Sequence, residues 1–156
     1  MGSYVDSGAV HLPFADPYCP RLRASVSAAD PTVSVGGTMV VVEGPRFSTR
    51  AESQHYAAQG WSLVNMTGLP EAALARELQM CYAAVALVTD MDAGVSTGEG
   101  VGQAEVFAMF ARNVERLKAL LTAVIGDLPD PAGCGCATWA DGLELTYPLP
   151  WAVSAE

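Results

Sequence analysis

The sequence predicts an α/β fold, with a mostly parallel or mixed twisted sheet flanked by helices, and three observations support this. Three short apolar runs alternate with two helical patterns in the order β-α-β-α-β. The runs are continuously apolar, as is typical of strands buried on both faces of a parallel sheet. The 156 residues are 51% hydrophobic and 16% charged, which suits a single domain over residues 1–156 with a real core.

The first strand and the first helix are predicted from their bounding residues. Residues 37–44, "GTMVVVEG", are rich in β-branched side chains and lie between glycines, which indicates a buried strand. In the polar segment that follows, Ser48 or Thr49 can cap a helix. Glu52 lies three residues after Thr49 and completes a capping box, and Gly60 is placed to end the helix.

The remaining elements follow the same alternation. Residues 61–66 predict a second strand, residues 69–79 a helix with Pro70 in its first turn, and residues 81–90 a third strand. Residues 102–125 have apolar side chains at helical spacing and predict one long helix that covers the sheet. The tail from Gly126 onward predicts no regular element.

Charge and hydropathy exclude several classes of partner. Eight Lys and Arg against seventeen Asp and Glu give a net charge of -9 and a pI near 4.5, which disfavours nucleic acids and anionic membranes as partners. The apolar runs are shorter than the roughly 18 residues that a spanning helix requires. The first residues show no secretory pattern, so we expect a cytoplasmic protein.

Polar side chains follow each of the three predicted strands. The segments "EGPRFSTR", "NMT" and "VTDMD" lie at consecutive strand ends, where ligands bind in parallel α/β sheets. Asp90 and Asp92 are two residues apart, and such residues share a face on an extended strand. The two carboxylates are therefore expected to point at one ligand.

Four stretches resemble the nucleoside phosphorylases of the trimeric methylthioadenosine phosphorylase and purine nucleoside phosphorylase type. They are "HLPFADPYCP", "EGPRFSTRAES", "VNMTGLPEAALARE" and "ALVTDMD", and the resemblance runs from about Tyr4 to about Ile125. It implies the phosphorylase fold and the phosphorolysis of methylthioadenosine, or a related 6-aminopurine nucleoside, to adenine and 5-methylthioribose 1-phosphate. Inorganic phosphate is then the co-substrate, and no cofactor is implied.

The resemblance assigns the catalytic roles to the two acids. Asp90 matches the acid that holds the imidazole-ring nitrogen of the base, and Asp92 matches the acid that accepts from the exocyclic amino group of adenine. Ser48 and Asp90 stand where 6-oxopurine enzymes usually carry Glu and Asn. A buried 6-oxo group facing a carboxylate would be a mismatch of about 1 to 3 kcal/mol, so adenine-type nucleosides are expected.

The same resemblance assigns four further residues to binding. Phe47 lines the base pocket together with Ser48, Met66 lies under the ribose, and Thr67 binds phosphate. His11 resembles a histidine that reaches the sugar pocket of a neighbouring subunit, which implies a homotrimer.

Each assignment has a simpler alternative. A lone Asp at a strand end is more often a cap or turn former than a catalyst, and a Met on a strand is normally core. His11 could equally be structural.

The glycine-rich stretch 96–105 lacks the Lys and the preceding strand of a P-loop, and we read it as a mobile loop near the pocket. We expect Cys134 and Cys136 to be reduced cysteines at the surface or at an interface, rather than a metal-binding or redox pair.

The resemblance covers only the C-terminal half of the family's pattern. The N-terminal half, with its glycine-rich phosphate turn, has no counterpart here, and residues 20–36 have a weak helical pattern where the family has a helix. We therefore expect the chain to be inactive alone and to work as a homotrimer or with a separate N-terminal half chain. The alternatives are a non-catalytic purine-binding or assembly module, and a purine nucleoside phosphorylase of broader specificity.

Overall fold

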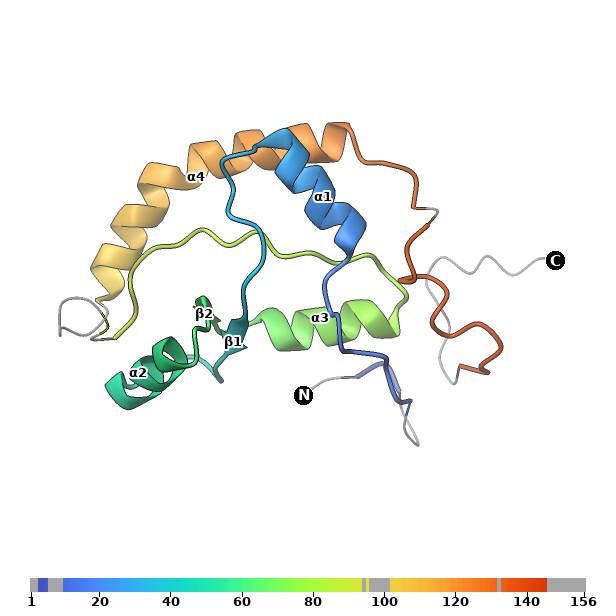
Figure 1. Cartoon of the computed structure of the whole chain (residues 1–156), viewed down its shortest axis with the longest axis horizontal. Helices are drawn as coiled ribbons and strands as arrows, with labels where there is room; N and C mark the ends of the chain where they lie inside the picture. Colours follow the sequence, from blue (N-terminus) through green and yellow to red (C-terminus); the bar gives the residue numbers. More distant parts are fainter. Residues whose placement is uncertain (1–2, 6–9, 94, 96–101, 132, 146–156) are drawn as a thin grey trace.

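The computed structural model describes residues 3–5, 10–93, 95, 102–131 and 133–145. Helices α1 and α4 lie side by side on one side of the molecule, and β1, β2, α2 and α3 lie on the other (Figure 1). The elements in chain order are α1 (Pro20–Ala29), β1 (Met39–Val41), α2 (Arg50–Ala58), β2 (Leu63–Asn65), α3 (Gly68–Glu77) and α4 (Gln103–Gly126).

The first two predicted strands pair in parallel, as expected. Met39, Val40 and Val41 of β1 lie opposite Leu63, Val64 and Asn65 of β2. Helix α2 makes the crossover between them, which is the connection that a parallel pair requires. The sequence therefore predicted the β-α-β-α order correctly, although each strand is only three residues long.

The capping box predicted for α2 is present, with Thr49 rather than Ser48 as the cap. The backbone N–H of Glu52 donates to Thr49 Oγ1 over 3.2 Å, and the backbone N–H of Thr49 donates to Glu52 Oε2 over 2.7 Å. Gly60 follows the helix with a φ of 72°, a left-handed conformation that glycine adopts without strain.

The prediction of a third strand over residues 81–90 is wrong for the described part of the chain. The segment crosses the molecule between α4 and the two strands without pairing with either strand (Figure 1). An apolar run becomes a strand only when a neighbour accepts and donates its ladder hydrogen bonds. At the start of the run, the backbone N–H of Cys19, outside the sheet, donates to Tyr82 O over 2.7 Å.

Residues 20–29 form a helix, α1, where the weak helical pattern had predicted none. Pro20 occupies the first turn, where its missing N–H is tolerated. Val26 of α1 packs against Leu120 and Val124 of α4 in the buried cluster of the molecule. Tertiary packing thus stabilises a helix that local propensity disfavours.

Helix α4 confirms the long helix predicted over 102–125. Val85, which belongs to the extended segment of residues 81–90, packs against the same cluster. Among the described helices, none combines the length and the apolar composition that a membrane span requires.

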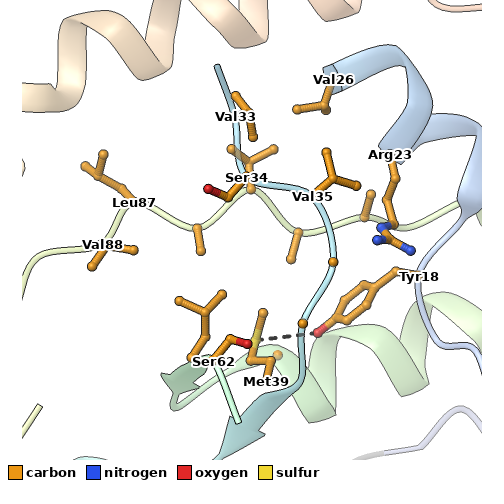
Figure 2. A pocket seen from close by; sticks show the side chains of 18 of the residues that line it. Tyr18, Arg23, Val26, Val33, Ser34, Val35, Met39, Ser62, Leu87 and Val88 are labelled. Carbon is orange, nitrogen blue, oxygen red and sulfur yellow. Dashed lines mark hydrogen bonds between the residues drawn. The ribbon is translucent and has the colours of Figure 1, made fainter. Parts of the chain in front are cut away.

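A large cavity separates the two sides of the molecule. Its volume is about 1190 Å³, and residues of α1, α4, β1, β2, α3 and the extended segment line it. Val33, Val35, Leu87 and Val88 lie around this space, and Tyr18 is linked to Met39 Sδ at its edge (Figure 2). Packed protein interiors retain few voids larger than a water molecule, so the described chain does not close its own core.

Candidate functional site

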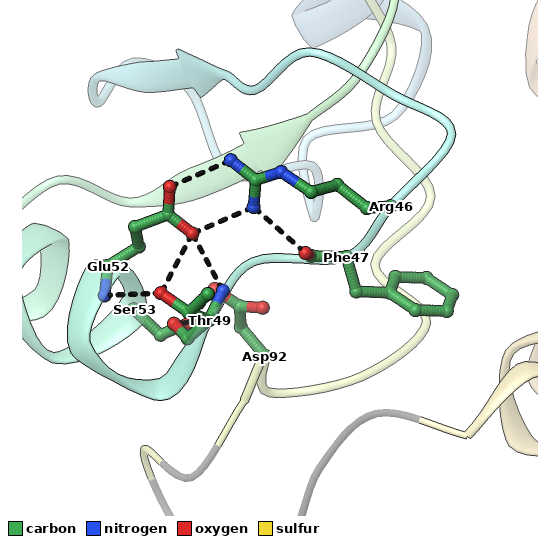
Figure 3. A network of polar contacts seen from close by, with 6 residues as sticks. All are labelled: Arg46, Phe47, Thr49, Glu52, Ser53 and Asp92. Atoms are coloured by element: carbon green, nitrogen blue, oxygen red, sulfur yellow. Dashed lines mark hydrogen bonds and ion pairs between the residues drawn. The ribbon is translucent and has the colours of Figure 1, made fainter.

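The segment after β1 is tied to the start of α2 by an ion pair. Arg46 binds Glu52 in a two-pronged arrangement, with both nitrogen–oxygen distances at 2.8 Å (Figure 3). The same guanidinium donates to the backbone oxygen of Phe47 over 3.1 Å. Arg46 and the Thr49 bonds together hold the pKa of Glu52 down at about 2. The loop that carries Phe47 and Ser48 is therefore fixed at both ends.

Phe47 and Ser48 differ sharply in their surroundings. Phe47 is 43% exposed, whereas Ser48 is 8% exposed. Ser48 Oγ is buried and, within the described part of the chain, has no hydrogen-bond partner. Buried hydroxyls are normally satisfied, so this one is free to bond a ligand.

The segment after β2 forms the N-terminus of α3. Asn65 Oδ1 accepts from the backbone N–H groups of Thr67 and Gly68, at 2.9 and 2.6 Å. Asn65 thereby does the work of a cap, and the Thr67 side chain makes no capping bond of its own. Thr67 is exposed at the positive end of the helix dipole, which favours an anion there.

Met66 contacts the loop that follows β1. A β-carbon on Gly44 would lie 3.3 Å from Met66 Sδ and 3.5 Å from Met66 Cβ, so the absence of a side chain at Gly44 permits this approach. Met66 is 41% exposed. It is therefore not the buried core residue that a Met on a strand usually is.

Asp90 and Asp92 form a turn and do not share the face of an extended strand. Asp90 Oδ1 accepts from the backbone N–H of Asp92 over 2.9 Å, and Asp90 Oδ2 accepts from Thr89 Oγ1 over 2.7 Å. Asp92 has a φ of 60°, so the chain leaves the extended conformation there. The expected shared face is wrong because this side-chain-to-backbone bond favours a turn.

Asp92 is held by α2, through a residue that sequence reasoning missed. Ser53 Oγ donates to Asp92 Oδ2 over 2.7 Å, and Ser53 is 2% exposed (Figure 3). This bond brings the end of the extended segment to the first turn of α2, beside Thr49. No local pattern marks Ser53, since a serine in a helix is ordinarily a surface residue. Asn65 could have been found, because an Asn just before a helix is a typical cap.

Two assignments remain apart from this arrangement. His11 is exposed, and in the described residues no hydrogen bond joins it to the other predicted site residues. The glycine-rich stretch 96–105 lies largely outside the described residues. The structure thus brings together the three segments that carry Phe47 and Ser48, Met66 and Thr67, and Asp90 and Asp92, and it leaves His11 outside.

The side chains of this site can hold a ligand through hydrogen bonds to hydroxyls and carboxylates. The ligand can be neutral, or it can carry an anionic group at the helix N-terminus. The described part offers the ligand a buried hydroxyl, a helix N-terminus, a thioether and two carboxylates. Among the described residues, the one group that could hold a metal ion consists of the four cysteines, none of which belongs to these segments.

Residues 2–126 match the family model of the phosphorylase superfamily. The chain is 58% identical over 148 residues to S-methyl-5'-thioadenosine phosphorylase of Mycobacterium tuberculosis, covering 95% of this chain and 56% of that protein. It is 50% identical over 149 residues to purine nucleoside phosphorylase of Streptomyces coelicolor, covering 90% of this chain and 52% of that protein.

A solved structure gives a matching result for the fold. Methylthioadenosine phosphorylase from Schistosoma mansoni in complex with adenine superposes with a TM-score of 0.73 at 32% identity. The match covers 81% of this chain and 53% of that one. The chain therefore spans about half the length of the relatives it matches.

Proposed function

Because this chain belongs to the phosphorylase superfamily, within the nucleoside phosphorylases of the methylthioadenosine type, we propose that its site supports phosphorolysis of methylthioadenosine or a related 6-aminopurine nucleoside. The products are adenine and 5-methylthioribose 1-phosphate. The observation that carries the proposal is the meeting of three segments in a chain so similar to methylthioadenosine phosphorylases: Met66 approaches the loop that leads to Ser48, and Asp92 is bonded to α2.

The reaction needs a group that stabilises the leaving base. A phosphate oxygen attacks the anomeric carbon, the bond from that carbon to the base nitrogen breaks, and the base leaves with the electron pair. Asp90 acts as the general acid: it donates a hydrogen bond and then its proton to the imidazole-ring nitrogen as negative charge gathers there, so the base leaves as neutral adenine and the barrier falls. Met66 presents an apolar surface to the cation-like sugar.

Specificity for an amino base comes from acceptors on the purine side. Asp92 accepts from the exocyclic amino group, and its bond from Ser53 fixes the carboxylate for that contact. Phe47 lies against the base and Ser48 Oγ bonds its edge, which would satisfy the one buried hydroxyl of the site that has no partner among the described residues. A 6-oxo base would meet a second acceptor at Asp92 and bind less well.

Phosphate binding is only partly provided by these residues. Thr67 stands at the N-terminus of α3, where the helix dipole and a hydroxyl favour an anion. A single hydroxyl binds a phosphate dianion only weakly. Phosphate-binding sites usually hold the dianion with several charged donors. We propose that the other phosphate ligands belong to a further, N-terminal part of the fold, on the same polypeptide or another.

The cavity between the two sides of the molecule supports this view. Its volume of about 1190 Å³ exceeds a typical ligand pocket, and many of its lining side chains are apolar. The extended segment 81–90 beside it pairs with neither strand of the described sheet. Further strands of the phosphorylase sheet would fill the space and pair with that segment.

Complementation tests the proposal. The chain is purified alone and after co-expression with the N-terminal portion of the Mycobacterium tuberculosis relative, and phosphate-dependent adenine release from methylthioadenosine is measured. We expect no release by the chain alone and release by the complex. The Asp90→Asn chain in the same complex is the control. Turnover by the chain alone would contradict the complementation claim, and a stable but inactive complex would contradict the proposed function.

The half-length match also favours a second function, purine binding without turnover. The residues that we assign to the base lie within the described chain, whereas Thr67 is the single residue that we assign to phosphate. Calorimetry with adenine on the chain alone distinguishes the two. Binding of adenine, with no activity in any complex, would favour a binding module, and faster turnover of inosine than of methylthioadenosine would favour a broader purine nucleoside phosphorylase.

A further inference from the structure

All four cysteines of the chain meet in one cluster. Cys19 immediately precedes α1, Cys81 begins the extended segment, and Cys134 and Cys136 lie in the tail after α4. Their Sγ atoms all lie within 4.8 Å of one another, and those of Cys81 and Cys134 are 3.3 Å apart. Cys19 and Cys136 are only 1% and 3% exposed. Of the two positions expected for Cys136, at the surface or at an interface, the surface position is therefore wrong.

Contacts around the cluster hold its three segments in place. The backbone N–H of Cys19 donates to Tyr82 O over 2.7 Å, which joins the start of α1 to the start of the extended segment. Trp139 Nε1 donates to Arg76 O over 2.8 Å and fastens the tail to α3. Arg21 Nη1 donates to the backbone oxygen of Pro129. The convergence is thus supported by bonds that do not involve sulfur.

We propose that these four thiolates bind one thiophilic divalent cation, zinc or ferrous iron, in a closed structural site. Such ions take four sulfur ligands in a tetrahedron with metal–sulfur distances of about 2.3 Å, which places the sulfurs about 3.8 Å apart. The observed spacing needs only small shifts to reach that geometry: the 3.3 Å pair opens slightly, and the wider pairs, none beyond 4.8 Å, close slightly. A disulfide needs about 2.05 Å, so each of two pairs would have to close much further.

The groups next to the cluster suit a bound ion with an excess of negative charge. Four thiolates and one divalent cation carry two net negative charges. Arg21 Nη2 donates to Cys81 Sγ over 3.4 Å. Such outer donors orient metal ligands and offset their charge. All four ligand positions are filled by protein, so the ion would be structural and would join α1, the extended segment and the tail.

The metal content of the untagged full chain, purified without chelators under reducing conditions, tests this proposal. We expect about one zinc or iron per chain by elemental analysis. Cobalt substitution should give the thiolate charge-transfer and intense visible bands of a tetrahedral cobalt–thiolate site. Elemental analysis distinguishes zinc from iron, and either result supports the proposal.

Variants separate ligation from general damage to the fold. Cys134→Ser and Cys136→Ser should each lower metal affinity or occupancy by about tenfold or more, whereas Ala137→Ser, an exposed change in the same loop, should keep the metal. Four free thiols without metal would overturn the proposal, and so would a mass four hydrogens lower, which indicates two disulfides. These measurements on the unmutated chain decide the matter even if a variant fails to fold. They do not depend on the proposed phosphorylase activity.

Discussion

Asp90 combines a structural role with its proposed catalytic one. Its two oxygens accept from the Asp92 backbone and from the Thr89 hydroxyl, so an alanine there would damage the turn as well as the chemistry. Asparagine keeps an oxygen for the Asp92 amide and removes the carboxyl group. It is therefore the informative substitution at this position.

We expect Asp90→Asn in the complemented enzyme to lower kcat for methylthioadenosine by about 10² to 10⁴, with a much smaller change in ground-state binding. The bond to the base strengthens as negative charge gathers on it, so its loss removes transition-state stabilisation. Inosine should improve relative to methylthioadenosine. Steady-state kinetics with methylthioadenosine, adenosine and inosine measure both effects.

Asp92→Asn is the matched comparison. It should change the preference between amino and oxo bases with a smaller fall in kcat, because its partner lies away from the breaking bond. Equal losses at Asp90 and Asp92 that do not depend on the base would mean that the pair is structural.

Ser48 and Ser53 provide a second contrast between binding and stability. Ser48→Ala should leave the free energy of unfolding within about 0.5 kcal/mol, because its hydroxyl has no partner among the described residues, and should weaken adenine binding about five- to tenfold. Ser53→Ala should destabilise the fold by about 1 kcal/mol, because it removes the donor to Asp92. Urea unfolding and calorimetry measure the two quantities. A loss of stability in Ser48→Ala with unchanged adenine affinity would contradict the assignment of Ser48 to the base.

Among the helices and strands, helix α2 positions the segments of the candidate site. Its capping box and the Arg46 ion pair fix the loop that carries Phe47 and Ser48, and its Ser53 holds Asp92. The Arg46 and Glu52 side chains are 51% and 32% exposed, so their ion pair is a surface interaction that salt will weaken.

The lowered pKa of Glu52 predicts a pH-dependent stability. Its pKa falls from 4.5 to about 2 on folding, so the unfolded chain binds more protons between these values. The stabilisation is present above about pH 4.5 and is lost as the pH falls towards 2. The difference in free energy of unfolding between the wild type and Glu52→Gln should shrink over this window. Glu105→Gln, an equal charge change in the first turn of α4, is the control, and a difference that does not vary with pH would contradict the prediction.

At the scale of the whole molecule, His11 offers a test of the proposed assembly. It is exposed, and among the described residues no hydrogen bond joins it to the other predicted site residues. This is compatible with a role in a neighbouring subunit. If sites form between subunits of a trimer, mixing His11→Ala and Asp90→Ala chains should restore up to about a quarter of the wild-type activity, because that fraction of sites receives both native residues. Activity of the mixture no higher than that of either variant alone would exclude a shared site.

Local patterns in the sequence predicted a large share of the fold. Glycines and β-branched residues marked β1, Thr49 and Glu52 marked the start of α2, and helical spacing marked α4. These features were predictable because capping, propensity and amphipathic spacing act over a few residues. The motifs also identified the segments that the structure brings together, although the roles of Asp90, Asp92 and the other site residues stay predictions.

Amino-acid order by itself thus determined which stretches become helices and short strands, which family the chain belongs to, and which side chains follow the strand ends. Only the tertiary structure decided that residues 81–90 lack a ladder in the described chain, that α1 forms against Leu120 and Val124, and that Ser53 holds Asp92. It also decided that four cysteines distant in sequence meet. The physical reason is that ladder partners, buried contacts and clustered thiols come from segments far apart along the chain, whose approach no local pattern encodes.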